Sequence, residues 1–317
     1  MTRATRWRSS RASRLSRDVK GQVERLASGE TLCGDGAWGT QLMARGLAPG
    51  VCPENMNLSK PEALVEIARL YLDAGADFVT TNSFGGSALN LGSHGLDHRT
   101  EEVNRLAVEI LKPEVGGRAY ISASVGPTGR ILEPYGDTAP EVVAEAFNCQ
   151  IGALIEAGAD VVCIETMIDL REAELAVRAA RSVSAEIPVI ATMTFDKGPN
   201  GFFTTMGNSV EQACEVLVEA GADIVGSNCG NGIDTMIEIA RDFTTHALVP
   251  VIIQSNAGLP ENRGGELVYP ESPEYMAERV SRLMDLGVGI IGGCCGTGPE
   301  HIRAIRTAVD DYRGTNC

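Results

Sequence analysis

The sequence predicts a single-domain α/β protein with the architecture of a (β/α)8 TIM barrel, from three observations. First, one αβ unit recurs at 72–79, 155–162 and 218–225, with a degenerate copy at 284–291. Each copy reads as the end of a helix, a glycine and a short apolar strand. Second, continuous apolar strands alternate with amphipathic helices, as in a parallel sheet covered by helices. Third, eight such units can be counted in 317 residues, and this fold usually takes about 250.

Each element can be placed by its pattern of apolar residues. The strands are expected, in chain order, at 31–35, 78–79, 119–124, 161–162, 189–194, 224–225, 249–254 and 290–291. The helices are expected at 61–74, 99–112, 138–157, 169–184, 208–220, 231–244, 272–286 and 299–313. A doubly wound open sheet is the alternative, although eight evenly spaced units are many for such a sheet. No shift in composition marks an internal boundary, so we expect one barrel at 26–313 and a tail at 314–317.

Composition and charge exclude several classes of function. No apolar run approaches the roughly 18 residues of a membrane-spanning helix. The net charge is −15, and an acidic body repels phosphate backbones and anionic lipid, which argues against nucleic acid and membranes as partners. Residues 1–20 differ, because they carry seven basic side chains and one acidic one. We expect 1–25 to be a basic, disordered extension, with a transit peptide as the alternative.

The nine cysteines are an odd number with no visible pairing, which favours metal or redox chemistry in a reducing cytoplasm over disulfides. Three of them follow predicted strands at the end where barrels place their chemistry: Cys229, Cys294 and Cys295. Sulfur ligands suit Zn2+, and three protein ligands leave a fourth, catalytic position open. The alternatives are buried thiols, a vicinal disulfide, or a structural site with a fourth ligand. His301 falls in the last helix and is predicted to be a packing or capping residue.

An open position on such a zinc ion suits a further thiol. A zinc-bound thiol is ionised at neutral pH, so it would become a nucleophile toward an electrophilic carbon. Longer connections after the first, third and fifth strands lie on the same rim, where they could cover a substrate.

Seven motifs resemble the homocysteine S-methyltransferase family, which includes the homocysteine-binding module of cobalamin-dependent methionine synthase. They are GDGAWGT at 34–40, TNSF at 81–84, GPTG at 126–129, IET at 164–166, SNC at 227–229, NAGLP at 256–260 and GGCCGTGPEHI at 292–302. The resemblance covers nearly the whole chain, and two of the motifs look closer to the cobalamin-linked branch than to the betaine-linked one. It implies that Cys229, Cys294 and Cys295 hold zinc.

The resemblance also implies roles for residues around the metal. Asp35 and Glu165 would hold the ammonium group of an amino-acid substrate, because paired carboxylates favour a cation; ordinary ion pairs or helix caps are the alternative. The amides after Asp35 and the hydroxyl of Thr81 or Ser83 would receive the substrate carboxylate.

Three further residues are assigned less directly. Asn228 and Asn256 would orient the groups that line the site, or simply form turns. Trp38 stands where the cobalamin enzyme usually has Met, so it would narrow the pocket or offer its face to a methyl-bearing cation. Packing in the core is the alternative for Trp38.

The function expected is a zinc-dependent S-methyltransferase that activates homocysteine, or another small thiol, and exchanges a methyl group with a separate corrinoid protein or methylcobalamin. The 317 residues leave no room beside the barrel for a built-in corrinoid domain. One alternative uses S-methylmethionine or S-adenosylmethionine as the donor. Another is a non-catalytic zinc- or thiol-binding subunit of a corrinoid complex. A monomer or a homodimer is expected.

Overall fold

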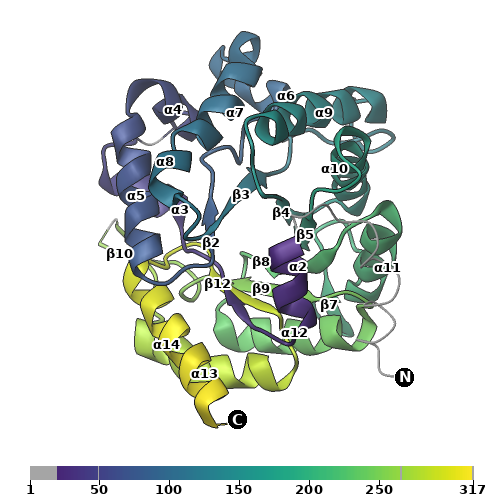
Figure 1. Ribbon diagram of the computed structural model, residues 1–317. Coiled ribbons are helices and arrows are strands. Elements are labelled where there is room, and N and C mark those ends of the chain that lie inside the picture. The colour runs from purple at the N-terminus through teal and green to yellow at the C-terminus, as the bar shows by residue number, and fades with distance from the viewer. Residues whose placement is uncertain (1–19, 49, 265, 316–317) are drawn as a thin grey trace.

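The computed structural model describes residues 20–48, 50–264 and 266–315. Eight parallel strands form one sheet in the order β1-β12-β9-β8-β5-β4-β3-β2, and the helices surround it (Figure 1). The strands are β1 (Leu32–Cys33), β2 (Phe78–Thr80), β3 (Tyr120–Val125), β4 (Val161–Met167), β5 (Val189–Met193), β8 (Ile224–Asn228), β9 (Val251–Ser255) and β12 (Ile290–Gly293). The predicted single-domain (β/α)8 barrel is therefore confirmed.

The main helices lie where the apolar periodicity places them. They are α5 (Pro61–Asp73), α7 (Thr100–Glu109), α9 (Pro140–Glu156), α10 (Leu170–Val183), α11 (Val210–Ala220), α12 (Ile233–His246), α13 (Pro273–Asp285) and α14 (Pro299–Thr315). Four of them begin with proline, whose fixed φ suits the first turn. The glycine of every repeated unit has a positive φ, which ends the helix and turns the chain into the next strand: Gly75, Gly158, Gly221 and Gly287.

The inside of the barrel is filled by every second strand residue. At its amino end the packed side chains include Phe78, Ile190, Ile252 and Ile290, and Leu26 joins them from helix α2 (Lys20–Ala27). In Figure 1 this helix, in purple, lies across the middle of the barrel. The second and larger cluster packs between the outer strand faces and the helices. The barrel is therefore a filled core that opens for chemistry at its carboxyl rim.

Helix α2 overlaps the end of the segment 1–25 that was expected to be a basic extension. The extension was expected to run to residue 25, but Lys20–Ala27 is helical, and Arg25 forms ion pairs with Glu30 and Asp77 at 2.6 and 2.8 Å. Leu26 packs against strand residues in the barrel interior and anchors the helix. The rest of the predicted extension, 1–19, lies outside the described residues.

The barrel closes between β1 and β2 mainly through side chains, since no ladder joins these two strands in the described part of the sheet. The amide of Asp77 donates to the Cys33 carbonyl, and the Asp77 carboxylate accepts from the Cys33 amide, both at 2.8 Å. Closer to the carboxyl rim, the backbone amide of Thr80, at the end of β2, donates to the carboxylate of Asp35 at 2.7 Å. Two aspartates thus complete the sheet at this seam.

Several short elements were not predicted. The connections after β1 and β2 and before β3 hold α3 (Trp38–Ala44), η1 (Pro53–Asn55), α4 (Met56–Ser59), α6 (Ala88–Leu91), η2 (Gly92–His94), η3 (Asp97–Arg99) and α8 (Lys112–Val115). Two hairpins stand on the rim: β6 (Asp196–Gly198) with β7 (Gly201–Phe203), and β10 (Glu261–Arg263) with β11 (Glu266–Val268). Within the described ranges, no helix combines the length and apolarity needed to cross a membrane.

Candidate metal centre and amine pocket

Three cysteines meet at the carboxyl rim. Cys229 follows β8, and Cys294 and Cys295 follow β12. Their Sγ atoms all lie within 4.8 Å of one another, and those of Cys229 and Cys295 are 3.8 Å apart. All three are free thiols, so the alternative of a vicinal disulfide does not apply. The structure brings together the three cysteines that the sequence grouped.

The backbone at both strand ends turns sharply to aim these side chains. Cys229 has φ 62° and is followed by Gly230 at φ 77°. A left-handed conformation is unusual for a residue with a Cβ and costs about 1 kcal/mol. The amide of Cys229 donates to the Gln254 carbonyl at 3.2 Å, which ties this turn to β9. The strain therefore serves to point one sulfur at the pair on β12.

The pKa values of the three thiols depend on one another, because the side chains are hydrogen-bonded. Hydrogen bonds from Cys229 and then Cys294 lower the pKa of Cys295, whereas hydrogen bonding to its two partners, followed by burial, raises that of Cys294. Hydrogen bonding among the three thiols thus favours the loss of one proton from the cluster. Tetrahedral zinc with Zn–S bonds of about 2.3 Å places two sulfurs about 3.8 Å apart. The all-sulfur donor set and the spacing of Cys229 and Cys295 fit that ion.

Tyr269 is a neighbour of the cluster that sequence reasoning missed. Its hydroxyl is hydrogen-bonded to the Cys295 sulfur and contributes to the low pKa of that thiol. Burial, followed by the charge on Cys295, raises the pKa of Tyr269 to about 12. A Cβ at Gly296 would overlap the Tyr269 ring, so the glycine permits this contact. The tyrosine directly follows β11, a strand that the apolar pattern did not reveal.

Asp35 is buried beside the cluster, 2% exposed. Its Oδ2 accepts from the indole N–H of Trp38 at 2.8 Å and from the Thr80 amide at 2.7 Å, and its Oδ1 accepts from the Thr80 hydroxyl at 2.8 Å. Burial nevertheless raises the pKa of Asp35 to about 6. Trp38 is itself buried, and its polar edge is directed at this carboxylate.

Glu165 faces Asp35 from β4. Its Oε1 accepts from the Ser124 hydroxyl at 2.5 Å, and its Oε2 has only a long contact, 3.4 Å, with the amide of Asn228. Burial first, and then the charge of Asp35, raise the pKa of Glu165 to about 7. Both carboxylates are therefore short of compensating positive charge.

A bulge in β4 sets the direction of Glu165. The register with β5 shifts between Ile164 and Met167, and Thr166 has φ 60°. Asn228 holds this conformation: its Oδ1 accepts from the Thr166 amide at 2.7 Å, and its Nδ2 donates to the Thr166 hydroxyl at 2.7 Å. The same Nδ2 lies 3.4 Å from Glu165 Oε2 and 3.9 Å from the Cys294 sulfur, so Asn228 contacts both the carboxylate and the cysteine cluster.

The remaining predicted residues are engaged within the protein. The Thr81 and Ser83 hydroxyls are 2.6 Å apart, and Ser83 donates to the Ser124 carbonyl at 2.7 Å. Asn256 is buried, and its Oδ1 has no hydrogen-bond partner among the described residues. The ring of His301 accepts from the Gly298 amide at 3.1 Å, which confirms the predicted capping role.

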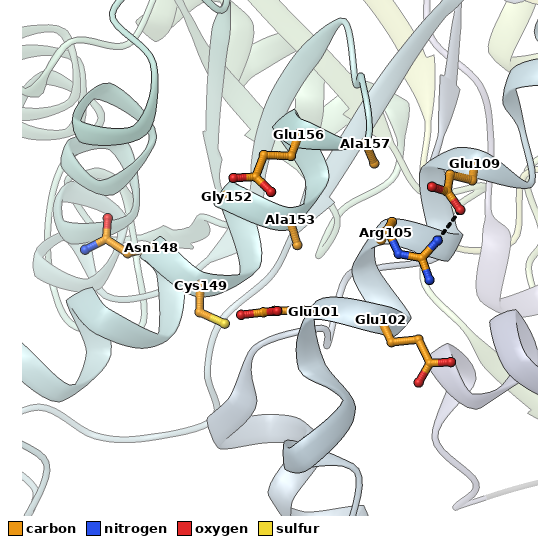
Figure 2. A pocket seen from close by; sticks show the side chains of 10 residues that line it. All are labelled: Glu101, Glu102, Arg105, Glu109, Asn148, Cys149, Gly152, Ala153, Glu156 and Ala157. Atoms are coloured by element: carbon orange, nitrogen blue, oxygen red, sulfur yellow. Dashed lines mark hydrogen bonds and ion pairs between the residues drawn. The ribbon is translucent and has the colours of Figure 1, made fainter.

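Two hollows differ in place and kind. A cavity of about 10 Å³ lies inside the barrel, lined by Gly34, Asp35, Phe78, Thr80, Ser122, Cys163, Glu165, Ile190, Ile252, Gln254 and Ile290. A groove of about 610 Å³ lies between α7 and α9 (Figure 2), lined by Glu101, Glu102, Arg105, Glu109, Asn148, Cys149, Gly152, Ala153, Glu156 and Ala157. The groove belongs to the outer layer of helices, whereas Asp35 and Glu165 line the small inner cavity.

Comparison with known proteins places this site in a family. Methionine synthase of Mycobacterium tuberculosis is 34% identical over 307 residues, which cover 91% of this chain and 25% of that protein. Methionine synthase of Mycobacterium leprae is 33% identical over 308 residues, 90% of this chain and 25% of that protein. The chain thus spans about a quarter of the length of these relatives.

Solved structures share the fold. The metallated form of the homocysteine methyltransferase MmuM from Escherichia coli superposes with a TM-score of 0.74 at 20% identity, covering 88% of this chain and 96% of that one. The family described as Homocysteine S-methyltransferase matches residues 32–309, which include the three cysteines and both carboxylates. The chain belongs to the homocysteine S-methyltransferase family and is a methyltransferase.

Proposed function

We propose that this chain is a zinc-dependent S-methyltransferase that binds homocysteine and exchanges a methyl group between its sulfur and a protein-held corrinoid, methylcobalamin. The observation that carries the proposal is the meeting of three cysteine sulfurs within 4.8 Å of one another, next to a buried carboxylate pair: Asn228 Nδ2 lies 3.9 Å from the Cys294 sulfur and 3.4 Å from Glu165 Oε2. A thiol-activating metal site and a pocket for a cation therefore adjoin, as the two ends of an amino-acid thiol require.

Cys229, Cys294 and Cys295 would hold the zinc ion, and Tyr269 would steady Cys295 through its hydroxyl. Zinc bound there keeps a substrate thiol ionised at neutral pH and so supplies the nucleophile. The strained turn at Cys229 fixes the direction of one ligand before the metal arrives. The protein's part is to present three sulfurs on one side and leave the other side open.

Asp35 and Glu165 would accept hydrogen bonds from the substrate ammonium. Burial raises the pKa of both carboxyls, and a cation between them favours their ionised forms. Asn228 keeps Glu165 in place through the bulge at Thr166. The amine end would thus anchor the substrate with its sulfur toward the cysteines.

The carboxylate of the substrate would be received by the amides after Asp35 together with Thr81 and Ser83. Both hydroxyls are hydrogen-bonded within the protein, so binding requires at least one of them to change partner. Asn256 would hold the adjoining loop, since its backbone N–H donates to the backbone carbonyl of Asn231 at 2.9 Å.

The rim favours a protein-held donor over a small sulfonium. Exposed apolar side chains stand on the connections that follow β1, β2, β3, β4, β5 and β9: Met43, Phe84, Ile131, Tyr135, Ile168, Met206, Leu259 and Leu267. Exposed apolar surface around a site is typical of a docking face for a large partner. We call these eight side chains the apolar rim. A small donor such as S-methylmethionine does not need an exposed apolar surface of this kind.

The test combines metal content with donor choice. We expect wild-type protein to bind about one zinc and to form methionine from homocysteine with methylcobalamin. The variant Cys229→Ala should lose most of both, because two thiolates hold zinc far more weakly than three. Cys149→Ala, a half-buried cysteine outside the cluster, is the matched control and should behave as wild type.

The outcomes separate the parts of the proposal. Zinc content unchanged in Cys229→Ala would refute the metal assignment. Methionine formed with S-methylmethionine or S-adenosylmethionine, and none with methylcobalamin, would refute the corrinoid donor and leave the thiol chemistry standing.

A further inference from the structure

Gln254 directs a long polar side chain into the barrel. It lies on β9, two residues after Ile252, and both line the small cavity that Asp35 and Glu165 also line. The Gln254 side-chain oxygen, Oε1, is buried and has no hydrogen-bond partner among the described residues. Neither the site motifs nor the cysteine pattern points to this residue.

The strands beside β9 make room for this side chain. Gln254 pairs in register with Gly292 on β12, and Gly34 lies at the end of β1, the next strand along. A Cβ at Gly292 would come within 3.2 Å of the Gln254 Cγ, and one at Gly34 within 3.5 Å of its Nε2. The side chain therefore lies across two glycines toward the strand that carries Asp35.

Gln254 Oε1 would be stabilised by a hydrogen-bond donor. A buried acceptor without a hydrogen bond costs about 1–3 kcal/mol. The cavity, about 10 Å³, holds a single group of the size of water. An ammonium group has that size and carries three N–H donors.

Three acceptors converge there. Asp35 Oδ1 carries one hydrogen bond, from the Thr80 hydroxyl, Glu165 Oε2 carries only the long contact with Asn228, and Gln254 Oε1 carries none within the described residues. A neutral third acceptor adds direction without adding another buried charge.

We propose that Gln254 is a substrate-binding residue whose Oε1 accepts one N–H of the substrate ammonium, and that it makes the site select amino thiols over thiols without an amine. The inference rests on the proposed function, since it assumes that an amino thiol is the substrate. It adds a specificity-determining residue to that site. A single trapped water is the competing occupant of the cavity.

The test compares two thiols on two proteins. Gln254→Met keeps the length of the side chain and removes the acceptor. By titration calorimetry on the purified, zinc-loaded protein, we expect this variant to bind homocysteine about tenfold more weakly and 4-mercaptobutyrate, which lacks the amine, as wild type does. Equal weakening of both thiols, or no change in either, would overturn the proposal and favour the trapped water.

A second variant guards against a folding defect. Gln254→Glu retains an acceptor at the same place and adds a negative charge that attracts an ammonium, so it should keep or increase the preference for homocysteine over 4-mercaptobutyrate; loss of that preference would also count against Gln254. Wild-type protein that binds both thiols equally would overturn the role of Gln254 alone. If it binds neither, the proposed function fails as well, and the two failures are thereby distinguished.

Discussion

Glu165 lies at the rim end of β4 with its carboxyl group buried and only one short hydrogen bond, from Ser124. In the proposed function, a substrate ammonium would supply the positive charge that this carboxyl group lacks. The same reasoning applies to Asp35, which is fixed by Trp38 and Thr80. The residues of the amine pocket are thus held in place before substrate binds, at a cost in electrostatic free energy.

That cost predicts a pH dependence of stability. The pKa of Glu165 rises from its usual 4.5 to about 7, so between these pH values the folded state holds a proton that the unfolded chain has released. The free energy of unfolding therefore falls as pH rises through this window. At about 1.4 kcal/mol for each pKa unit, the loss is on the order of 3 kcal/mol.

Glu165→Gln removes this dependence, because an amide does not titrate. Urea unfolding of the metal-free protein from pH 4 to pH 8 should show wild type losing stability relative to Glu165→Gln by roughly 3 kcal/mol. Parallel pH curves for the two proteins would contradict the assigned burial of the carboxyl group.

Some of these residues could be foreseen and others could not. The three cysteines were predictable because strands end at one rim, so residues after different strands meet there. Tyr269 was not, because its position depends on a hairpin of two three-residue strands. The bond between Trp38 and Asp35 was missed for another reason: it depends on side-chain direction, which apolar periodicity does not specify.

At the scale of elements, the repeated αβ unit determines most of the barrel. Its glycines were predicted to end helices, and all four adopt a positive φ. Inside the barrel, other glycines serve a different purpose, since they let neighbouring backbones or long side chains approach. Gly226 on β8 is the tightest case, because a Cβ there would overlap the carbonyl oxygen of Ile252 on β9.

Gly226→Ala should therefore be severely destabilising. The overlap is with backbone that belongs to the adjacent strand, so relief requires the two strands to separate. We expect a loss of at least 3 kcal/mol in chemical denaturation or failure to accumulate as folded protein.

Gly152→Ala is the matched control. Gly152 lies in α9, where a Cβ meets nothing within 4 Å, so the substitution should stabilise the helix by up to about 1 kcal/mol. Similar effects of the two substitutions would contradict the distinction between strand and helix glycines.

Elements that escaped prediction share a physical feature: they are short and largely exposed. The hairpins β6–β7 and β10–β11 bury few side chains, so no alternation of apolar and polar residues marks them. Helix α2 escaped because its sequence is predominantly polar; Leu26 is the residue that reaches the barrel interior among its described side chains. Long, buried elements could be placed from their pattern, whereas rim segments depend on contacts with the finished barrel.

At the scale of the whole molecule, the two ends of the barrel differ in what covers them. Leu26 of helix α2 packs at the amino end, while the carboxyl end carries the apolar rim around the cysteine cluster. Under the proposed function, a large methyl donor would therefore dock at the rim.

Charge placed on the apolar rim tests this arrangement. Tyr135→Glu combined with Leu267→Glu adds two charges at exposed residues that are not among the proposed zinc ligands. The double variant should raise KM for a protein-held methylcorrinoid about tenfold or more, because docking loses apolar contact.

The same double variant should use free methylcobalamin at the wild-type rate, since the site itself is unaltered. Equal KM values for the protein-held donor in both enzymes would contradict docking on the apolar rim. A matching loss with the free cofactor would instead indicate damage to the site.

The seam between β1 and β2 ties substrate choice to the integrity of the sheet. Asp35 links the two strands through Thr80 and is also the residue proposed to receive the amine, so it cannot be altered for a new substrate without loosening the joint. Substitution of Asp35 is therefore expected to lower stability as well as amine binding. Gln254 on β9 lines the same cavity, and its Oε1 links no strand among the described residues, so substrate preference should change there at less cost in stability.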